Sequence, residues 1–156
     1  MKKIVREYAF VAAVIILIII ALVFFFSPVV IDGHSMDPTL NDRDRHIAYK
    51  QASIDRFDIV IFDEIGSGSI FVKRIIGMPG DTVKVSHNEL YINGKKTTQS
   101  FTTQGVTDDI DEVTVPADSY YVLGDNRENS TDSRMIGFVN KDQIDGKLGF
   151  KFYPFK

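Results

Sequence analysis

The chain has 156 residues, a formal net charge of −3 and no cysteine. That length fits one domain, and the absence of cysteine excludes disulfide bonds, zinc–thiolate sites and a cysteine nucleophile. The apolar fraction of 44% and charged fraction of 25% exclude a disordered chain, and the small negative charge gives no electrostatic basis for a nucleic-acid partner.

An apolar block near the N-terminus is the first predicted element. Residues 9–26 form a run of 18 residues without a charged or polar side chain. As a helix this run spans about 27 Å, close to the thickness of about 30 Å of a bilayer core. A cleaved secretory signal is the alternative, but its apolar stretch is usually about 7–15 residues, and Phe24–Pro28 lacks a small-x-small cleavage pattern. The block therefore predicts a retained transmembrane anchor.

The charges around this block predict its orientation. The segment before it carries three basic residues and one acidic residue: Lys2, Lys3, Arg6 and Glu7. The positive-inside rule then makes residues 1–8 a cytoplasmic tail and residues 27–156 an extracytoplasmic domain with a net charge of −5. An exported domain of this size can bury its own core, and its lack of cysteine favours a bacterial cell membrane.

The exported domain is predicted to be mainly β. Short runs rich in β-branched and aromatic residues predict strands at 59–62, 70–72, 83–85, 113–115, 120–123 and 146–153. Asn93-Gly94 predicts a hairpin within 89–95, and glycines predict turns at 66–69 and 77–80. Residues 97–112 are polar and are expected to form a surface excursion. Many short strands favour a folded-over antiparallel β-sheet or barrel-like domain, and helix signals outside the membrane are weak.

Ser35 is the first candidate for chemistry. It lies between Gly33 and the segment Met36-Asp37-Pro38, in a constrained turn that could present its hydroxyl beside free backbone N–H groups. A serine that only caps local amides is the alternative.

Lys73 is the second candidate. It lies between the apolar runs 70–72 and 75–76, so both faces of a strand would surround its amine with apolar side chains. Desolvation lowers the pKa of a lysine, whereas at the ordinary pKa of about 10.4 only about one amine in a few thousand is neutral at pH 7. A lysine base therefore needs a dry pocket, and a solvated lysine on an edge strand is the alternative.

A third segment, 124–134, is dense in polar and charged residues. Ser130 or Ser133 could accept a hydrogen bond from a buried amine, and Asp132 and Arg134 could form an ion pair. A solvent-exposed loop is the alternative.

Together, and in this order after an anchor, these segments resemble the bacterial type I signal peptidases, or leader peptidases. Those are membrane-anchored serine endopeptidases with a Ser/Lys dyad that remove signal peptides from exported preproteins. The resemblance rests on Ser-Met-x-Pro-Thr at 35–39, Lys-Arg-Ile-Ile-Gly-x-Pro-Gly-Asp at 73–81 and Gly-Asp-Asn-Arg-x-x-Ser-x-Asp-Ser-Arg at 124–134. It covers nearly the whole chain.

The resemblance implies roles for individual residues. Ser35 would be the nucleophile and Lys73 the general base of an acyl-enzyme mechanism that uses no metal or cofactor. Ser130 matches a serine that hydrogen-bonds the lysine amine, and Asp132 and Arg134 match a supporting ion pair.

The resemblance also points to the surfaces that would bind substrate. Family members prefer small side chains before the cut, and the candidate substrate-binding residues are Ile31, Gly33, Met36, Leu40, Phe71 and Val72. For Leu40 an ordinary core position is an equal alternative. At position 33 some members have a serine whose hydroxyl is the second oxyanion donor, so Gly33 leaves that task to a backbone amide or water. The implied partners are signal peptides, the lipid bilayer and the secretion translocon.

Three other readings remain open. A Ser-His-Asp hydrolase could use His34, His46 or His87, although adjacent side chains on a turn usually diverge, which makes His34 a poor base for Ser35. A membrane-tethered β module that only binds exported chains is a non-enzyme alternative. A self-cleaving relative with the same dyad, as in LexA-like repressors, is disfavoured by the apolar block and the missing basic domain.

Overall fold

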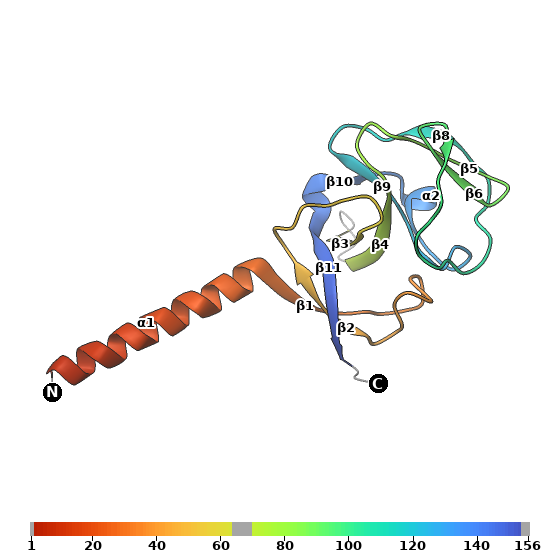
Figure 1. Ribbon diagram of the computed structural model, residues 1–156. Coiled ribbons are helices and arrows are strands. Elements are labelled where there is room, and N and C mark those ends of the chain that lie inside the picture. The colour runs from red at the N-terminus through yellow and green to blue at the C-terminus, as the bar shows by residue number, and fades with distance from the viewer. Residues whose placement is uncertain (1, 64–69, 154–156) are drawn as a thin grey trace.

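The computed structural model describes residues 2–63 and 70–153 and shows one long helix joined to a β domain (Figure 1). The helix α1 (Lys2–Phe25) projects away from that domain. Its stretch Arg6–Phe25 is long and apolar enough to cross a membrane, and its apolar window is 0% buried by the rest of the chain. A bilayer is the environment that would cover such a surface, so α1 is a candidate membrane span.

The end of the helix differs by one residue from the prediction. Phe26, which the apolar pattern assigns to the helix, is instead the first residue of strand β1 (Phe26–Val30) and pairs with Tyr49. The physical reason lies in Pro28, which disfavours a helical conformation at Ser27 and has no N–H to donate to the Phe24 carbonyl, so the helix cannot continue through this segment. The chain therefore turns from helix to strand without a linker.

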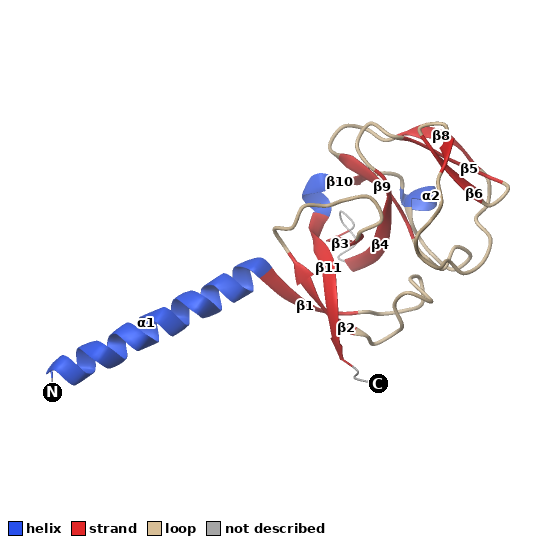
Figure 2. Ribbon diagram, viewed as in Figure 1, coloured by secondary structure: helices blue, strands red, loops and turns tan. Residues whose placement is uncertain are grey.

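The larger sheet of the described residues has seven strands in an antiparallel arrangement. In spatial order they are β1, β2 (Arg45–Tyr49), β11 (Ile144–Tyr153), β3 (Ile59–Asp63), β4 (Ile70–Gly77), β9 (Ser119–Leu123) and β10 (Val139–Asn140). Strands dominate the domain, as Figure 2 shows in red.

A smaller four-stranded sheet lies at the end of the domain far from α1 (Figure 1). Its order is β7 (Lys95–Lys96), β6 (Glu89–Ile92), β5 (Thr82–Ser86) and β8 (Ile110–Thr114). The chain passes from the larger sheet to the smaller one through the turn between β4 and β5.

The core lies on both faces of the larger sheet. β9 is buried along its whole length, and side chains on a strand alternate between the two faces. Tyr121 and Leu123 pack into the cluster shared with the small sheet, whereas Tyr120 and Val122 pack into a second cluster with Val60. A sheet covered on both faces gives β4 and β9 a rigid frame for the polar groups at their ends.

The mainly β, antiparallel fold with one N-terminal apolar helix is confirmed. Each predicted strand in the described residues overlaps an observed one, and the turn predicted at 66–69 lies outside them. The sequence did not predict β1, β2 or β10. It also did not predict the short helix α2 (Ser133–Ile136) or the 3-10 helix Lys141–Gln143.

Candidate active site

Ser35 lies in a turn that follows β1. Gly33 has a φ of +91°, a left-handed conformation that glycine adopts without strain. Its N–H donates to Asp42 Oδ1 at 2.9 Å, and the N–H of Asp37 donates to the His34 carbonyl at 3.2 Å. These bonds fix the backbone on both sides of Ser35, whose own side chain is half-buried.

Lys73 reaches Ser35 from the middle of β4, where it pairs with Val60 of β3. Its Nζ lies 2.8 Å from Ser35 Oγ and donates to the Val72 carbonyl at 2.9 Å. The residue is 3% exposed, so its amine is shielded from water. The structure therefore brings the two candidate residues into hydrogen-bond contact across 38 positions of sequence.

Burial changes the protonation of this amine. It lowers the pKa of Lys73 from its ordinary value of 10.5 to about 8, and the negative charge of Asp132 opposes part of that shift. No carboxylate in the described part of the chain forms an ion pair with Nζ, and the Phe71 ring lies 5.4 Å from it. At pH 7 about one amine in ten is then neutral. The site can hold a neutral amine beside a hydroxyl.

The contact predicted between Ser130 and the Lys73 amine is absent. Ser130 Oγ is buried and has no hydrogen-bond partner among the residues described. It packs against Gly124, where an added Cβ would lie 2.1 Å from this Oγ. The bonds from Nζ go instead to Ser35 and Val72, which leaves a buried hydroxyl without a partner in the wall of the same cavity.

Asp132 and Arg134 do meet. Arg134 donates from Nε and from Nη2 to the two carboxylate oxygens of Asp132, both at 2.8 Å. Asp132 is fully buried, accepts from the Gly124 N–H at 3.0 Å and caps the N-terminus of α2. The pKa of Arg134 is raised by this hydrogen bonding. The ion pair thus joins the loop after β9 to the start of α2.

A second buried ion pair joins all three sequence segments, and the sequence reasoning missed it. Arg74 donates from Nε to Asp125 Oδ1 at 2.8 Å and from Nη2 to Oδ2 of the same carboxylate. Thr39 also donates its hydroxyl hydrogen to Asp125, and the Arg74 guanidinium lies 3.9 Å from the centre of the Phe101 ring. The available signal was that Arg74 follows Lys73, that Asp125 lies in the polar segment 124–134, and that the two carry opposite charges.

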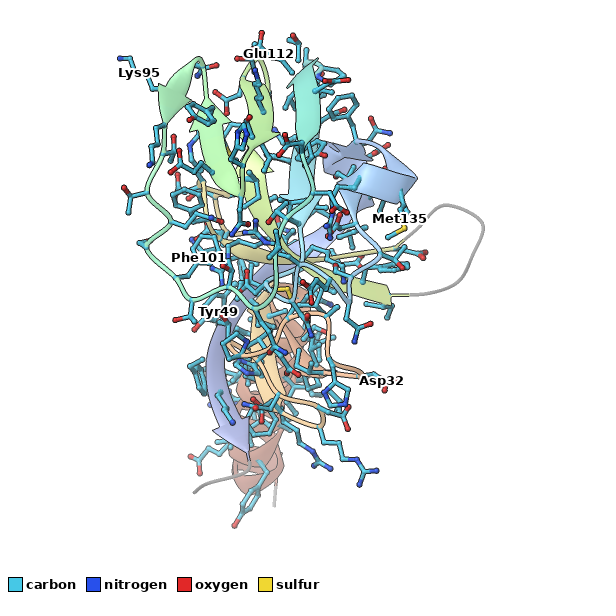
Figure 3. The ribbon with its side chains drawn as sticks, turned by 90° about the vertical axis from the view of Figure 1, so that its right-hand side faces the viewer. Asp32, Tyr49, Lys95, Phe101, Glu112 and Met135 are labelled. Atoms are coloured by element: carbon cyan, nitrogen blue, oxygen red, sulfur yellow. The ribbon has the colours of Figure 1, made fainter. Side chains whose placement is uncertain are left out.

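A cavity of about 1200 Å³ opens beside Ser35 and Lys73. Five of the six predicted substrate-binding residues line it, namely Ile31, Gly33, Met36, Phe71 and Val72. Figure 3 shows Asp32 and Met135, two further lining residues, on the same side of the molecule. Ile70 and Met135 are exposed apolar residues of the lining that the sequence reasoning did not assign to this site.

Leu40 is the exception among the predicted pocket residues. It is 4% exposed, packs with Ile31 and Met36 and is not part of the cavity lining. Leu40 thus belongs to the core, which is the alternative that the sequence had left open for it.

The histidines do not form a triad with Ser35. His34 is exposed and lies 3.0 Å from Asp37, His46 contacts the Gly149 carbonyl, and His87 contacts its neighbour Ser86. Within residues 2–63 and 70–153, none of the three contacts Ser35 Oγ. No group of three or more His, Asp or Glu side chains in those ranges could hold a metal ion.

Comparison with known proteins identifies the family of this chain. The model of the family described as signal peptidase, peptidase S26, matches residues 3–153. The chain belongs to this family. Signal peptidase I of Bacillus amyloliquefaciens is 44% identical, and the match covers 83% of this chain and 77% of that protein. Signal peptidase IB of Staphylococcus aureus (strain COL) is 34% identical, and the match covers 99% of this chain and 93% of that protein.

A solved structure agrees with this assignment. The crystal structure of a signal peptidase I from Enterococcus faecalis V583 aligns with a TM-score of 0.56 and 34% identity, covering 63% of this chain and 98% of that chain. The matched range contains Ser35, Lys73 and the segment 124–134. As a member of the signal peptidase family, the chain is a peptidase, and its N-terminal helix is consistent with a membrane anchor.

Proposed function

We propose that the protein is a membrane-anchored serine endopeptidase that cleaves N-terminal signal peptides from exported preproteins, with Ser35 as nucleophile and Lys73 as general base. The observation that carries this proposal is the 2.8 Å separation of Ser35 Oγ from a buried Lys73 Nζ. The substrate class follows from membership of the signal peptidase family.

In this mechanism a single residue, Lys73, both accepts and donates protons. Neutral Lys73 takes the hydroxyl proton of Ser35 as Oγ bonds to the scissile carbonyl carbon, and the carbonyl electron pair moves to oxygen. As that intermediate collapses, the C–N bond breaks and the Lys73 ammonium gives its proton to the leaving amine. Lys73 then takes a proton from water as the water attacks the acyl-enzyme, and it returns a proton to Ser35 when the acid product leaves.

The cavity suits a chain segment that ends in apolar side chains. Buried Ile31 and Met36 line the cavity beside Ser35, and Phe71 and Val72 of β4 line it as well. Apolar groups of a substrate would pack against these side chains, whereas charged ones would lose their hydration there. This supports a preference for apolar residues before the cut.

The predicted membrane anchor determines where the proposed enzyme works. In this proposal residues 1–8 lie in the cytoplasm, α1 crosses the bilayer, and the domain from residue 27 onward works on the outer face of a bacterial cell membrane. A preprotein leaving the secretion translocon still has its apolar segment in lipid, so its cleavage site would emerge close to the end of α1. The translocon is thus the proposed neighbour of the enzyme.

The test is cleavage of a preprotein by the purified full chain in detergent. Ser35→Ala and Lys73→Met should each lower kcat at least about 10³-fold, since removing a member of such a pair abolishes the covalent route. His34→Ala should keep activity, which separates the dyad from a Ser-His-Asp triad. A Ser35→Ala protein that still cleaves, or a wild-type protein that binds the preprotein without cutting it, would overturn the proposal.

A further inference from the structure

One buried residue, Asn126, holds the two peptide groups that flank the candidate nucleophile. Asn126 donates from its side-chain Nδ2 to the His34 carbonyl at 3.0 Å and from its backbone N–H to the Ser35 carbonyl at 3.0 Å. A carbonyl oxygen can only accept, so the nitrogen of the Asn126 side chain must face it. Asn126 is 6% exposed, which keeps water from competing for these bonds.

These bonds determine where the Ser35 N–H points. A trans peptide group is planar, so the N–H of Ser35 points opposite to the His34 carbonyl. Two donors hold that carbonyl, because Asp37 N–H also reaches it at 3.2 Å. Among the described residues, nothing accepts a hydrogen bond from the Ser35 N–H. The free N–H therefore points away from the buried loop and lies beside Ser35 Oγ, where negative charge would develop during attack.

We infer that Asn126 is a positioning residue that aims the Ser35 N–H at the oxyanion of the tetrahedral intermediate. The inference rests on the proposed function, because it needs Ser35 to be the nucleophile. Asn126 touches neither substrate nor reacting atoms and acts through the peptide group between His34 and Ser35.

Gly33 increases the importance of this N–H. It offers no hydroxyl to the oxyanion, and its own N–H is bonded to Asp42 Oδ1. The Ser35 N–H thus carries a larger share of oxyanion stabilisation than it would beside a side-chain donor, and its direction matters correspondingly more.

Gln104, in the segment 97–109, also holds the backbone around Asn126. The N–H of Gln104 donates to the Asp125 carbonyl at 2.9 Å, and the N–H of Arg127 donates to the Gln104 carbonyl at 2.8 Å. Asn126 is therefore held between this segment and the turn of Ser35, so little further ordering is needed when the intermediate forms.

The test compares Asn126→Ala and Asn126→Asp with wild type. Asp keeps the shape of the side chain but loses the N–H₂ donor and turns a carboxylate oxygen toward the His34 carbonyl. We expect kcat for the preprotein to fall about 10- to 100-fold in both variants with KM nearly unchanged, which is less than the loss for deleting an oxyanion donor itself. In Asn126→Ala the pH at which the rate rises should not move, because that substitution adds no charge and leaves Lys73 untouched.

A peptide aldehyde gives a readout specific to the oxyanion. Ser35 Oγ adds to its carbonyl carbon, the carbonyl electron pair moves to oxygen, and Lys73 takes the serine proton. The matching peptide alcohol binds without this addition. The ratio of aldehyde affinity to alcohol affinity should fall in the Asn126 variants by the same factor as kcat.

Gln99→Ala is the matched control, because it removes a bond to the neighbouring Arg127 and leaves the peptide group of Ser35 alone. It should keep the wild-type affinity ratio. An Asn126→Ala protein with the wild-type ratio, or a Gln99→Ala protein with an equal loss, would overturn the inference. In the wild-type protein, the Ser35 amide proton should move downfield in the NMR spectrum when the aldehyde adds. An unmoved signal would overturn the inference even if both Asn126 variants fail to fold.

Ser35→Ala separates this inference from the function on which it rests. If Ser35→Ala still cleaves the preprotein, the proposed function fails. If Ser35→Ala is inactive while both Asn126 variants keep the wild-type kcat and affinity ratio, only the role of Asn126 fails.

Discussion

At the scale of single residues, the pKa of Lys73 sets the pH at which the proposed enzyme works. Burial lowers this pKa to about 8, and only the neutral amine can take the proton of Ser35. The value of kcat/KM should therefore rise with pH through a single limb centred near 8 and then level off. The measurement is a pH–rate profile for a peptide substrate. His34→Ala should keep this limb, whereas a limb near 6.5 that disappears in that variant would point to a histidine base.

Ser130 makes a different prediction, because its buried hydroxyl has no partner in the described structure. An unpaired buried hydroxyl destabilises the fold, so Ser130→Ala should leave the melting temperature unchanged or raise it. If the hydroxyl accepts a hydrogen bond from Lys73 once the amine is charged, the same variant should lower kcat about tenfold or more. Thermal unfolding and cleavage rates measured on one preparation test both statements. A fall in stability together with unchanged kcat would make Ser130 an ordinary packing residue.

At the scale of elements, the loop after β9 and the turn after β1 meet at a glycine. A Cβ on Gly124 would lie 2.6 Å from the Ser35 carbonyl oxygen and 2.5 Å from Ser130 Cβ. Gly124→Ala should therefore push the two segments apart and lower kcat about 100-fold or more, because small displacements of a nucleophile are costly. The measurement is kcat for the preprotein, corrected for the folded fraction.

Gly149→Ala is the control for this steric argument. Its Cβ would lie 2.5 Å from the Tyr49 ring, at the pairing of β11 with β2 and outside the cavity lining. It should lower stability, by about 1–3 kcal/mol for an overpacked site, while each folded molecule keeps its activity. Equal losses of activity in both glycine variants would refute a specific role for the contact at Gly124.

The strands also show which features the sequence could predict and which it could not. The alternation of apolar residues around Lys73 is local, so the strand and the burial of the amine were both predictable. β1 contains Pro28, which weakens a strand pattern, and it lies at an edge of the larger sheet, where proline is tolerated. The contact of Arg74 with Asp125 joins positions 51 residues apart, so it depends on the pairing of β4 with β9 and leaves no local pattern.

Residues 97–112 are a second segment whose structure the sequence predicted only in part. Their polarity predicts a solvated surface excursion, yet Thr107 is 3% exposed and donates its N–H to Asn88, and Gln99 and Gln104 bond to the loop that holds Asn126. Polar side chains that satisfy buried polar groups have the same composition as those that face water. Composition alone could not separate these two roles.

At the scale of the whole molecule, the anchor joins the domain without a linker. α1 ends at Phe25 and β1 begins at the next residue, so the helix passes directly into the larger sheet (Figure 1). Lys50 caps this end of the helix, since its N–H donates to the Phe25 carbonyl at 2.9 Å and its Nζ to the Val23 carbonyl at 3.1 Å. These carbonyls belong to the last turn, where helix partners run out. The junction should therefore hold the candidate active site at a fixed height above the bilayer.

Inserting Gly-Ser-Gly-Ser between Phe25 and Phe26 tests this consequence. A flexible linker lets the domain sample many heights, which lowers the effective concentration of the active site at the emerging cleavage site. In vesicles, the insertion should slow preprotein cleavage by about tenfold and produce additional cut positions, as read by mass spectrometry of the products. A short peptide in detergent should be cleaved at the wild-type rate, because the insertion leaves the dyad intact. Unchanged rates and cut positions in vesicles would mean that substrate binding in the cavity, and not the junction of α1 with β1, selects the bond that is cut.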